Sequence, residues 1–596
     1  MANWTISAVR EDFDEIANEF AISPITARLL VNRNIRSQEE ITSYLNGTLA
    51  DLADPFLLKG LTDAVKILEG KIAANAKIRI IGDYDADGIC ATAILFKGLT
   101  TLGVQVDTVI PDRIKDGYGI NIDLINNAAA AGIDTIITCD NGIAAVAEIA
   151  LARQLGLTVI VTDHHEPPDE LPTACAIIDP HQTDCLYPFK AICGATVALR
   201  LIEGLFCHLK TPLSPILYDE LVLLAAIATV CDVMELCGEN RILVKHCLKE
   251  LGKCQNIGLK ALINATGIGD KKLTAYHIGF VIGPAINATG RIDCANRSLS
   301  LLLTSDNDEA VQIAASLVAI NEERKLMTSQ RVTEAMQIVE AMELDKVIVI
   351  YLPDCHESLA GIIAGRIREH YHRPIFVLTD SEDGVKGSGR GMDAYHMFDE
   401  LSRVKNLFIK FGGHKLAAGL TMAKENVETF RHLINENAVL TADDFVEKVK
   451  IDIALPFGFA TLDLVKEFAL LEPFGVGNRK PLFAQKGVTF LAGQEMGTSG
   501  RAARYTVADS DGHRHELVYF GDIATFNAYL DEAFSPELRK NLYQKDIATR
   551  NNRSGSDTII EKNNVYQSII LNVTYQPEIN HYKERVRVQL IMQHYC

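Results

Sequence analysis

The stretch Lys77–Leu95, KIRIIGDYDADGICATAIL, decides how the rest of the chain is interpreted. It opens with the apolar run Ile78–Ile81, which is typical of a short buried strand. A second apolar run, from Ile89 to Leu102, follows within a few residues and has the length and composition of a helix. The sequence therefore predicts a strand, a tight acidic turn and a helix, in that order.

Three carboxylates crowd the turn between this strand and this helix. Asp83, Asp85 and Asp87 lie within five residues of one another, and ionised carboxylates that close together repel each other. Oxygen ligands gathered at the end of a strand favour a divalent cation among them. The alternative is a solvated turn in which Asp87 caps the helix.

The composition describes an ordinary folded protein of several domains. The chain has 596 residues, of which 48% are hydrophobic and 23% are charged, so three or four domains are expected. No apolar run approaches the roughly 18 residues that suggest a membrane span. The N-terminus, MANWTISAVREDFDE, lacks a basic head and a long apolar core, so no secretory signal is expected.

The cysteines indicate the cellular compartment of the protein, and the net charge bears on its binding partners. Thirteen cysteines are scattered without a CxxC pair, which favours reduced thiols in a cytoplasm over a disulfide framework or a zinc ribbon. The net charge of −19 argues at first against a nucleic-acid partner, because phosphate contacts need Lys and Arg. Net charge does not describe a local groove, however, and an acidic protein can carry a basic channel.

Strands and helices alternate from residue 77 to about residue 240. The expected strands are short apolar runs at 77–81, 104–110, 134–139, 158–162 and 175–179. Such alternation predicts a mainly parallel sheet with helices on both faces. Ligands of these sheets bind beyond the carboxyl ends of the strands, so the chemistry is expected there.

Polar residues that can bind a metal or a phosphate follow each later apolar element. In chain order they are Asp112-Arg113, Asp140-Asn141-Gly142, Asp163-His164-His165 and Cys231-Asp232. One Asp in such a place is usually a turn or cap residue. Four such places in succession favour one shared site at the edge of the sheet.

This set of residues suits hydrolysis with two metal ions. Two Mn²⁺ or Mg²⁺ ions about 3.5–4 Å apart activate a water molecule and stabilise charge on phosphoryl oxygens, and they need a bridging carboxylate with further carboxylates around it. The mixture of Asp and His favours Mn²⁺ over Ca²⁺, and the absence of cysteine clusters disfavours structural zinc.

The second half of the chain predicts a long connector followed by another α/β domain. Residues 306–342 form a helical pattern without glycine or proline, about 55 Å long at 1.5 Å per residue. Further elements are expected as a strand at 346–352, a helix at 357–371, a strand at 374–379, a loop at 387–390 and a turn at 412–414.

Short strands and turns dominate the chain from about residue 447. The expected strands are 449–455, 488–492, 505–508, 516–520, 566–575 and 585–591. Asp509-Ser510-Asp511-Gly512 is a hairpin turn signal, and residues 540–564 resemble a mobile loop. A small barrel of OB type fits this pattern, and such barrels bind single strands by stacking and charge.

The motifs resemble those of the DHH phosphoesterase superfamily. The matching residues are GDYDADG at 82–88, CDNG at 139–142, DHH at 163–165 and Cys231-Asp232. In the second half, Gly412-Gly413-His414 with Ala417-Ala418-Gly419 is similar to the signature of the associated DHHA1 domain.

Narrower motifs resemble the RecJ family within this superfamily. They are Ile282-Gly283-Pro284, Asn287, Gly290-Arg291, Asp293, Arg373-Pro374, Gly387-Ser388-Gly389-Arg390 and Pro473–Asn478. The resemblance covers essentially the whole chain in the same order. It implies a single-stranded-DNA-specific 5′→3′ exonuclease that releases mononucleotides in DNA repair and recombination.

The fold class that follows is α/β, with two α/β domains (DHH and DHHA1) joined by a long helix, and a C-terminal β-barrel of OB type. The expected divisions are an N-terminal helical segment at 1–75, the DHH catalytic domain at 76–305, the connecting helix at 306–343, the DHHA1 substrate-binding domain at 344–445 and the OB-type domain at 446–596.

The resemblance also implies roles for individual residues. The metal ligands would be Asp85, Asp87, Asp140, His164 and Asp232, with Asp83 as a further ligand or a neighbour of one. Asp140 would bridge two divalent cations, Mn²⁺ or Mg²⁺. His165 would contact the scissile phosphate or orient water, and Asp163 would fix a histidine tautomer.

Substrate contacts follow from the same resemblance. Arg113, Ser388 and Arg390 match positions that hold the 5′-terminal phosphate, and the fork of an arginine meets phosphate oxygens in two places. The alternative for Gly387–Arg390 alone is an ordinary flexible loop. Arg291 and His414 would lie near the substrate, although a structural role in the turn is a close alternative for His414.

Two places depart from the family pattern. Cys355–Ser358 stands where the family has Trp-His-x-Gly, and Ala285 stands where it has an arginine. Trp4 is the only tryptophan, so base stacking would depend on Tyr, Phe or His. These departures affect the residues expected to bind the substrate, and they leave the expected metal ligands unchanged.

The partners implied are single-stranded DNA with a 5′ end, a helicase and a single-strand-binding protein. A monomer in the cytoplasm, without a membrane partner, is expected. Two other functions stay open at this point: a DHH phosphodiesterase of short oligonucleotides or cyclic dinucleotides, and a non-catalytic protein that binds single-stranded DNA. Activity on long strands compared with dinucleotides distinguishes the exonuclease from the small-substrate phosphodiesterase. Metal-dependent turnover distinguishes it from the non-catalytic DNA-binding protein.

Overall fold

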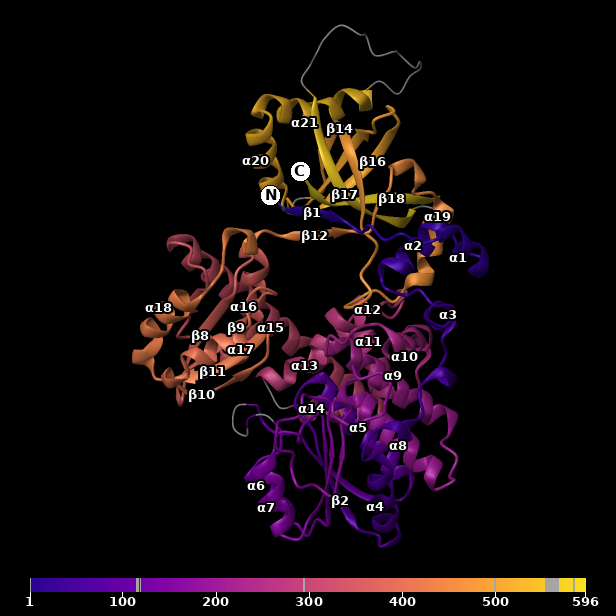
Figure 1. The fold of residues 1–596 in the computed structure, drawn as a ribbon, viewed down its shortest axis with the longest axis vertical. Coiled ribbons are helices and arrows are strands. Elements are labelled where there is room, and N and C mark those ends of the chain that lie inside the picture. The colour runs from indigo at the N-terminus through magenta and orange to yellow at the C-terminus, as the bar shows by residue number, and fades with distance from the viewer. Residues whose placement is uncertain are drawn as a thin grey trace. The chain divides into compact units, whose positions relative to one another are not determined.

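The computed structural model describes residues 2–113, 117, 119–292, 295–497, 500–551, 568–582 and 585–596. Its contacts divide the chain into two units (Figure 1). The larger unit comprises Asn46–Phe445 with Pro473–Asn478, and the smaller unit comprises Met1–Leu45, Val446–Glu472 and Arg479–Cys596. Residues 1–75, which the sequence predicts as one segment, are thus shared between the two units.

A five-stranded sheet forms the base of the larger unit. Its order is β3-β2-β4-β5-β6, and every pairing is parallel. The strands are β2 Lys77–Ile81, β3 Gln105–Val109, β4 Thr135–Cys139, β5 Thr158–Thr162 and β6 Ala176–Ile178. The five expected strands are confirmed. Because β3 and β4 lie on opposite sides of β2, the order reverses there, which is where such sheets bind ligands.

Alternate residues of these strands serve two separate cores. Ile78, Ile80, Ile137 and Ile160 belong to one cluster, whereas Ile81, Ile136, Val159 and Val161 belong to another. Helices α4 (Leu61–Ala73), α5 (Ala86–Thr101) and α8 (Gly194–His208) pack in the first cluster, and α6 (Ile122–Ala130) and α7 (Val146–Gln154) in the second. The period of two places helices on both faces, as predicted.

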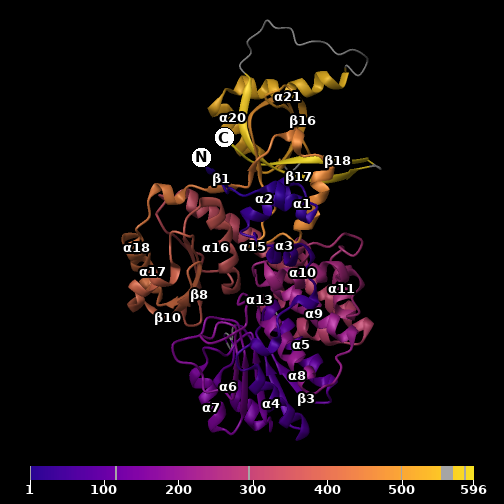
Figure 2. The same cartoon turned by 45° about the vertical axis from the view of Figure 1, so that its right-hand side comes forward.

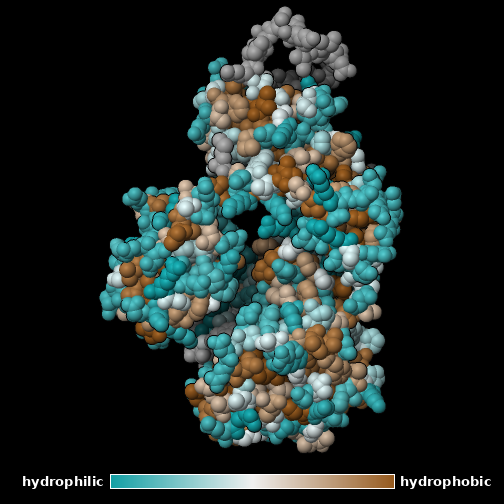
Figure 3. All heavy atoms as spheres, in the orientation of Figure 1, coloured by the Kyte–Doolittle hydropathy of each residue, from teal (hydrophilic) through white to brown (hydrophobic). Residues whose placement is uncertain are grey.

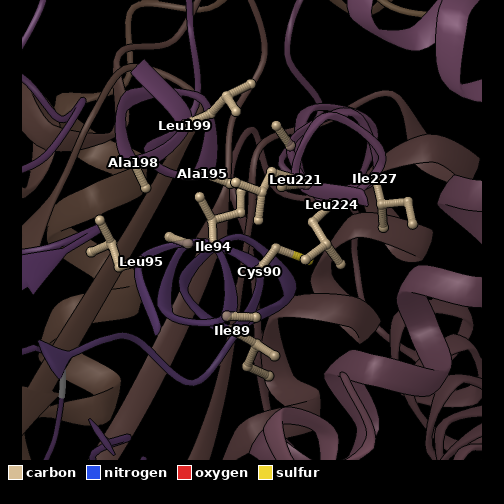
Figure 4. Packing of buried hydrophobic residues seen from close by; sticks show 14 of the residues in the cluster. Ile89, Cys90, Ile94, Leu95, Ala195, Ala198, Leu199, Leu221, Leu224 and Ile227 are labelled. Carbon is tan, nitrogen blue, oxygen red and sulfur yellow. The ribbon is translucent and has the colours of Figure 1, made fainter. Parts of the chain in front are cut away.

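Helix α5 lies in the centre of the larger core. Its residues Ile89, Cys90 and Ile94 are fully buried and pack with residues of α8 and α9 (Pro215–Cys231), as Figure 4 shows. A helix that is apolar on all sides is stable only when it is surrounded by protein. This burial fixes the first turn of α5, and with it the acidic turn that precedes the helix.

A series of helices leads from this sheet to the second domain. They are α10 (Gly238–Glu250), α11 (Ile257–Ala265), α12 (Ala275–His277), α13 (Gly283–Ile292), α14 (Asn296–Leu303) and α15 (Asn307–Ala341). Asp306 caps α15 by accepting hydrogen bonds from Asp308 and Glu309 at 2.8 and 3.1 Å. The long connecting helix predicted at 306–342 is confirmed.

The second domain contains a mixed sheet in the order β10-β11-β9-β8-β7. Its elements are β7 Ile348–Tyr351, α16 Glu357–Tyr371, β8 Ile375–Ser381, β9 Gly384–Arg390, α17 Met397–Arg403, β10 Phe408–Gly413, β11 Ala417–Met422 and α18 Val427–Asn437. The predicted loop at 387–390 is wrong, because these residues complete β9 and pair with both β8 and β11. Glycine is needed at two of these positions, because a Cβ at Gly387 would lie 2.5 Å from the Leu378 side chain and one at Gly389 would lie 2.3 Å from that of Met397.

The smaller unit contains a closed barrel. Strands β14, β15, β16, β18 and β17 pair in that order, and β17 pairs back onto β14 (Figure 2). The bounds are β14 Phe483–Glu495, β15 Ala502–Ala508, β16 Arg514–Phe520, β17 Ile569–Tyr582 and β18 Arg585–Tyr595. Closure removes the exposed edges that a sheet of this size would otherwise carry, and the predicted C-terminal barrel is confirmed.

Other elements complete the smaller unit. They are β1 Asn3–Ile6, α1 Phe13–Phe20, α2 Pro24–Asn32, α3 Gln38–Asn46, β12 Lys448–Ile451, β13 Ile453–Ala454, α19 Leu462–Glu467, α20 Ile523–Ala533 and α21 Pro536–Asn551. The mobile loop predicted at 540–564 is wrong for its first part, because residues up to Asn551 continue α21. Residues 552–564 lie outside the described residues.

The hydropathy of the described helices, and that of the face drawn in Figure 3, is consistent with the hydrophobic and charged fractions of the sequence. Over the described residues, no helix combines the length and the apolar character that crossing a membrane requires. The face of the β7–β11 domain drawn in Figure 3 is covered largely by hydrophilic side chains, with only small hydrophobic patches.

Candidate functional site

The acidic turn lies between β2 and α5, as predicted. Asp85 is the N-cap of α5, and its Oδ1 accepts hydrogen bonds from the amides of Asp87 at 2.9 Å and Gly88 at 3.1 Å. The cap is therefore Asp85 and not Asp87. A side chain at Gly88 would place its Cβ 2.5 Å from the Asp83 amide nitrogen, so glycine is required for the turn to fold back on itself.

Asp140 holds an unusual backbone conformation at the end of β4. Its φ is +61°, in the left-handed region that few residues other than glycine adopt. Asn141 fastens the turn by donating to the carbonyls of Cys139 at 2.8 Å and Ile81 at 3.1 Å. Such strained residues persist where the surroundings impose them, and they concentrate at functional sites.

The DHH residues after β5 form an ordered hydrogen-bond system. The Asp163 carboxylate accepts from the amides of His164 at 2.8 Å and Ile143 at 2.9 Å. Its Oδ1 also lies 2.7 Å from Nδ1 of His165. Asp163 therefore orients the ring of His165.

Side chains from five elements converge beside this system. Nε2 of His164 lies 3.1 Å from Asp140, 3.7 Å from Asp87 and 3.8 Å from Asp232. Two groups of oxygen and nitrogen atoms are spaced as metal ligands: Asp83 with Asp85 and Asp140, and Asp87 with His164 and Asp232. A third such group, Asp140 with His164 and His165, links the two.

The N-terminus of α8 contributes to the same cluster. The amides of Gly194 and Ala195 each donate to the Asp87 carboxylate at 2.7 Å. A Cβ at Gly194 would come within 2.7 Å of the Asp140 side chain, so the helix approaches this closely only because the residue is glycine. The positive end of α8 partly balances the negative charge gathered there.

The raised pKa values of these carboxyl groups show that their ionised forms are unfavourable when no cation is bound. Burial, with Asp85 nearby, raises the pKa of Asp87 to about 6, and burial with Asp87 nearby raises that of Asp232 to about 8. Burial also raises the pKa of Asp83 and of Asp140 well above the ordinary value, and neighbouring carboxylates add to both shifts.

The pKa values of His164 and His165 shift in opposite directions. Burial, reinforced by His165, lowers the pKa of His164 to about 4, so this ring is neutral and can act as a ligand. Burial is the largest single effect on His165 and acts to lower its pKa, but the hydrogen bond with Asp163 and the charges of the nearby carboxylates together outweigh it and raise that pKa to about 9. His165 is therefore a cation near neutral pH.

The cluster fits two divalent cations. Asp83 is 2% exposed, and its Oδ1 has no hydrogen-bond partner in the part of the chain that the structure describes. An orphaned carboxylate oxygen beside other carboxylates is stable when it binds a cation. The donors are oxygens with one neutral imidazole nitrogen, a set that suits Mn²⁺ or Mg²⁺.

A second feature of the same unit is a cavity of about 490 Å³. Arg113, Arg291, Ser388 and Arg390 all line it, as do Tyr84, Lys386 and Lys410. The Arg113 guanidinium lies 4.9 Å from the centre of the Tyr84 ring, and Nη1 of Arg291 donates to the carbonyl of Ser358 at 2.7 Å. The four substrate-binding residues predicted from the sequence that line the cavity thus come together from three separate segments of the chain.

The first turns of α16 form one wall of this cavity. Glu357, Ser358 and Gly361 line it, and His356 caps the helix by accepting from the Ser358 amide. A Cβ at Gly361 would lie 2.7 Å from the Arg390 guanidinium and 2.9 Å from the Ser388 hydroxyl. A helix N-terminus and several arginines together make a site for a phosphate.

One predicted substrate residue does not line the cavity. His414 lies in the turn between β10 and β11, where its Nδ1 accepts from the Leu416 amide at 3.4 Å. Burial lowers the pKa of His414, and Arg390 and His165 are among the cations that lower it further. His414 therefore lies close to both features and also supports its own turn.

Sequence reasoning missed several residues of the cavity. Tyr84 lies inside the acidic motif, and Lys410 stands two residues before Gly412, so proximity to a motif was the available signal. For Gly361 the only signal was a glycine within a regular helical pattern. Asp293, part of a predicted motif, lies outside the described residues.

Comparisons with known sequence families assign the class of the protein. Residues 77–229 match the DHH family N-terminal domain, and residues 344–439 match the DHHA1 domain. The protein is a phosphoesterase of DHH type. Residues 451–594 match the RecJ OB domain, and this match narrows the class.

Similar proteins with curated names support the same assignment. The chain is 35% identical to the single-stranded-DNA-specific exonuclease RecJ of Bacillus subtilis over 565 residues, covering 94% of this chain and 70% of the relative. It is 37% identical to the protein of the same name in Salmonella typhimurium, covering 72% of this chain and 77% of the relative. The chain belongs to the RecJ family of single-stranded-DNA-specific exonucleases.

Solved structures show the same architecture. Crystal structures of RecJ from Thermus thermophilus with Mn²⁺ and with Mg²⁺ match with TM-scores of 0.81 and 0.73, at 27% and 26% identity. Both matches cover 100% of this chain, and 79% and 78% of the other chains respectively.

Proposed function

We propose that the protein degrades single-stranded DNA from its 5′ end and releases mononucleotides, with two divalent cations, Mn²⁺ or Mg²⁺, in the acidic cluster. The observation that carries this proposal is the position of Tyr84. This residue lies between Asp83 and Asp85 in the metal turn, and it also lines the arginine cavity. The anion site is therefore next to the hydrolytic site, as an enzyme that measures from a terminal phosphate requires.

The residues divide into a cluster that binds metal and groups that hold the substrate. Asp85, Asp87, Asp140, His164 and Asp232 would hold the ions, with Asp83 beside them, and Asp140 would be shared. When bound, the ions supply a water of lowered pKa and stabilise negative charge on the phosphoryl oxygens.

The other side chains orient the strand for cleavage. Arg113, Ser388 and Arg390 bind the terminal phosphate, and Arg291 supports the adjoining wall through Ser358. His165, held by Asp163 and positively charged near neutral pH, donates a charge-assisted hydrogen bond to a phosphoryl oxygen.

The test uses a long single-stranded DNA labelled at its 5′ or 3′ end, with Mn²⁺ or Mg²⁺. We expect early release of the 5′ label as a mononucleotide and no attack on blunt duplex DNA. Early release of the 3′ label would contradict the polarity. Cleavage of dinucleotides with long strands spared would replace the proposal by a small-substrate phosphodiesterase.

We also propose the setting in which the enzyme acts. A nuclease that acts only on single strands needs an enzyme that opens the duplex, so a helicase and a single-strand-binding protein are natural partners. The twelve described cysteines are all free thiols, as in a reducing cytoplasm. Light scattering at the mass of one chain would support a monomer, and twice that mass would refute it.

Gly361 provides a matched test of the phosphate cavity. We expect Gly361→Ala to lower activity about tenfold or more on 5′-phosphorylated DNA, because its Cβ would displace Arg390 and Ser388. Gly365→Ala, one turn later in the same helix, adds a Cβ into open space and serves as the control.

The measurement is kcat/KM on oligonucleotides with a 5′ phosphate and with a 5′ hydroxyl. The loss in Gly361→Ala should be larger for the phosphorylated strand. An equal loss on both strands, or an equal loss in Gly365→Ala, would show that the cavity does not recognise the terminal phosphate.

A further inference from the structure

Two aromatic rings stand exposed on the larger unit, away from any core. Tyr276 is 63% exposed and Phe280 is 65% exposed. Their ring centres lie 4.9 Å apart, with the planes inclined by 23°. Aromatic side chains usually bury most of their surface, so a stacked pair left in solvent requires an explanation.

The pair lies on an irregular helix. Helix α12 continues directly into a π-helical turn at Ile278–Ile282 and then into α13. Turns of this kind are rare and occur frequently at functional sites. Tyr276 and Phe280 are the exposed residues of this irregular part, and its residues Ile278 and Ile282 are buried.

The same face of the helical run leads to the catalytic site. After Phe280, the partly exposed positions of α13 include Pro284, Asn287 and Arg291, at spacings of four, three and four residues that follow one face of a helix. Asn287 accepts a hydrogen bond from the Ala86 amide at 2.6 Å, beside the acidic turn, and Arg291 lines the arginine cavity.

The length of this face fits a short stretch of DNA. Phe280 and Tyr276 lie about 16 and 22 Å from Arg291 along the run, at 1.5 Å per residue. A stacked strand advances about 3.4 Å per nucleotide. A strand with its 5′ phosphate in the cavity would therefore bring a base near the fifth to seventh position to the aromatic pair.

Positive charge accompanies the aromatic pair. Lys271 is exposed and close enough to His277 to lower the pKa of that ring, after the larger effect of burial. Lys272 is exposed as well. Aromatic rings beside lysines are the usual means by which proteins hold single strands without reading their sequence.

We infer that Tyr276 and Phe280 form a stacking platform for a base of the substrate strand, a few nucleotides from the 5′ end, and that α13 leads the strand from this platform to the cavity. The inference rests on the proposed function for the identity of the strand. It adds a nucleobase site whose role is to bind and align the DNA.

The test places one 2-aminopurine at each of positions two to eight of a 5′-phosphorylated strand. Binding is measured with EDTA present, so that no hydrolysis occurs. We expect stacking to quench the fluorescence most strongly near the fifth to seventh position. Phe280→Ala and Tyr276→Ala should lose this quenching and bind about tenfold more weakly, whereas Phe280→Tyr should retain both.

The control is Ile216→Ala, which removes a similarly exposed apolar side chain. Ile216 lies at the N-terminal end of α9, and Asp232 lies at its C-terminal end. Unchanged quenching in Phe280→Ala, or equal loss in Ile216→Ala, would overturn the inference. A fall in melting temperature of Phe280→Ala without any change in fluorescence would also overturn it, because the pair would then pack within the protein.

Kinetics separates this inference from the proposed function. Phe280→Ala should raise KM on long strands and leave the turnover of a 5′-phosphorylated dinucleotide unchanged, since a dinucleotide does not reach the platform. A wild-type protein that shows position-dependent quenching but degrades no DNA with either metal would refute the nuclease proposal and leave the platform standing.

Discussion

Replacing Asp140 by alanine should reduce exonuclease activity roughly a thousandfold or more, because the loss should exceed the 10–100-fold effect typical of residues that only support metal ligands. Asp140 belongs to two of the three groups of potential ligands in this cluster, so its removal should affect both ions. The measurement is release of a 5′ label from single-stranded DNA at saturating Mn²⁺.

Two further variants make this result specific. Asp140→Asn keeps the shape of the side chain and tolerates the left-handed backbone, so it should fold normally and be equally inactive. Asp107→Asn removes an exposed carboxylate that pairs with Arg79 on neighbouring strands and should retain full activity. Substantial activity in Asp140→Asn would exclude Asp140 as a shared metal ligand.

Mn²⁺ should stabilise the folded protein, and more strongly as the pH rises from about 6.5 to 8. A ligand at a hundred times its Kd stabilises by about 2.7 kcal/mol, which corresponds to a shift of several degrees in melting temperature. The measurement is thermal unfolding with Mn²⁺ and with EDTA at several pH values.

The direction of the pH effect follows from the pKa values of the cluster. Asp232 has its pKa raised to about 8, chiefly by burial, so its ionisation destabilises the metal-free fold as the pH rises toward 8. His165, with a pKa raised to about 9, contributes stability below its unfolded value of about 6.5 and loses it as the pH rises further. Both groups therefore make the metal-free protein less stable over this range.

Bound cations hold the carboxylates in the ionised form and should remove most of the Asp232 contribution. Asp232→Asn should show a smaller gain from Mn²⁺, whereas Asp107→Asn should show the full gain. A metal-free melting temperature that rises between pH 6.5 and 8 would contradict the electrostatic description of the cluster.

The sheet and the acidic cluster could be predicted from the sequence because both depend on local patterns. The five strands of the first sheet are short apolar runs, and each potential metal ligand lies within a few residues of the end of an apolar element. Parallel strands bring their carboxyl ends to one edge, so adjacency in space follows from position in the chain. The placement of Asp140, His164 and Asp232 near one another follows from this rule.

Other features depend on contacts that no local pattern encodes. Gly387–Arg390 has the composition of a loop, but it is a strand because β8 and β11 supply partners on both sides. The helix cap is Asp85 because the helix begins two residues earlier than expected, which leaves Asp87 to meet the α8 N-terminus. The exposure of Tyr276 and Phe280 required the packing of the whole helical run.

The pairing of β1 with β12 has a consequence for how the chain is made. Asn3 pairs with Lys448 and Ile6 with Ile451, so partners in this small parallel sheet are more than four hundred residues apart. At about 5–20 residues per second, the first strand leaves the ribosome roughly 20 to 90 seconds before its partner exists. During that interval β1 is an unpaired edge exposed to other nascent chains, and a product truncated before Lys448 keeps it in that state permanently.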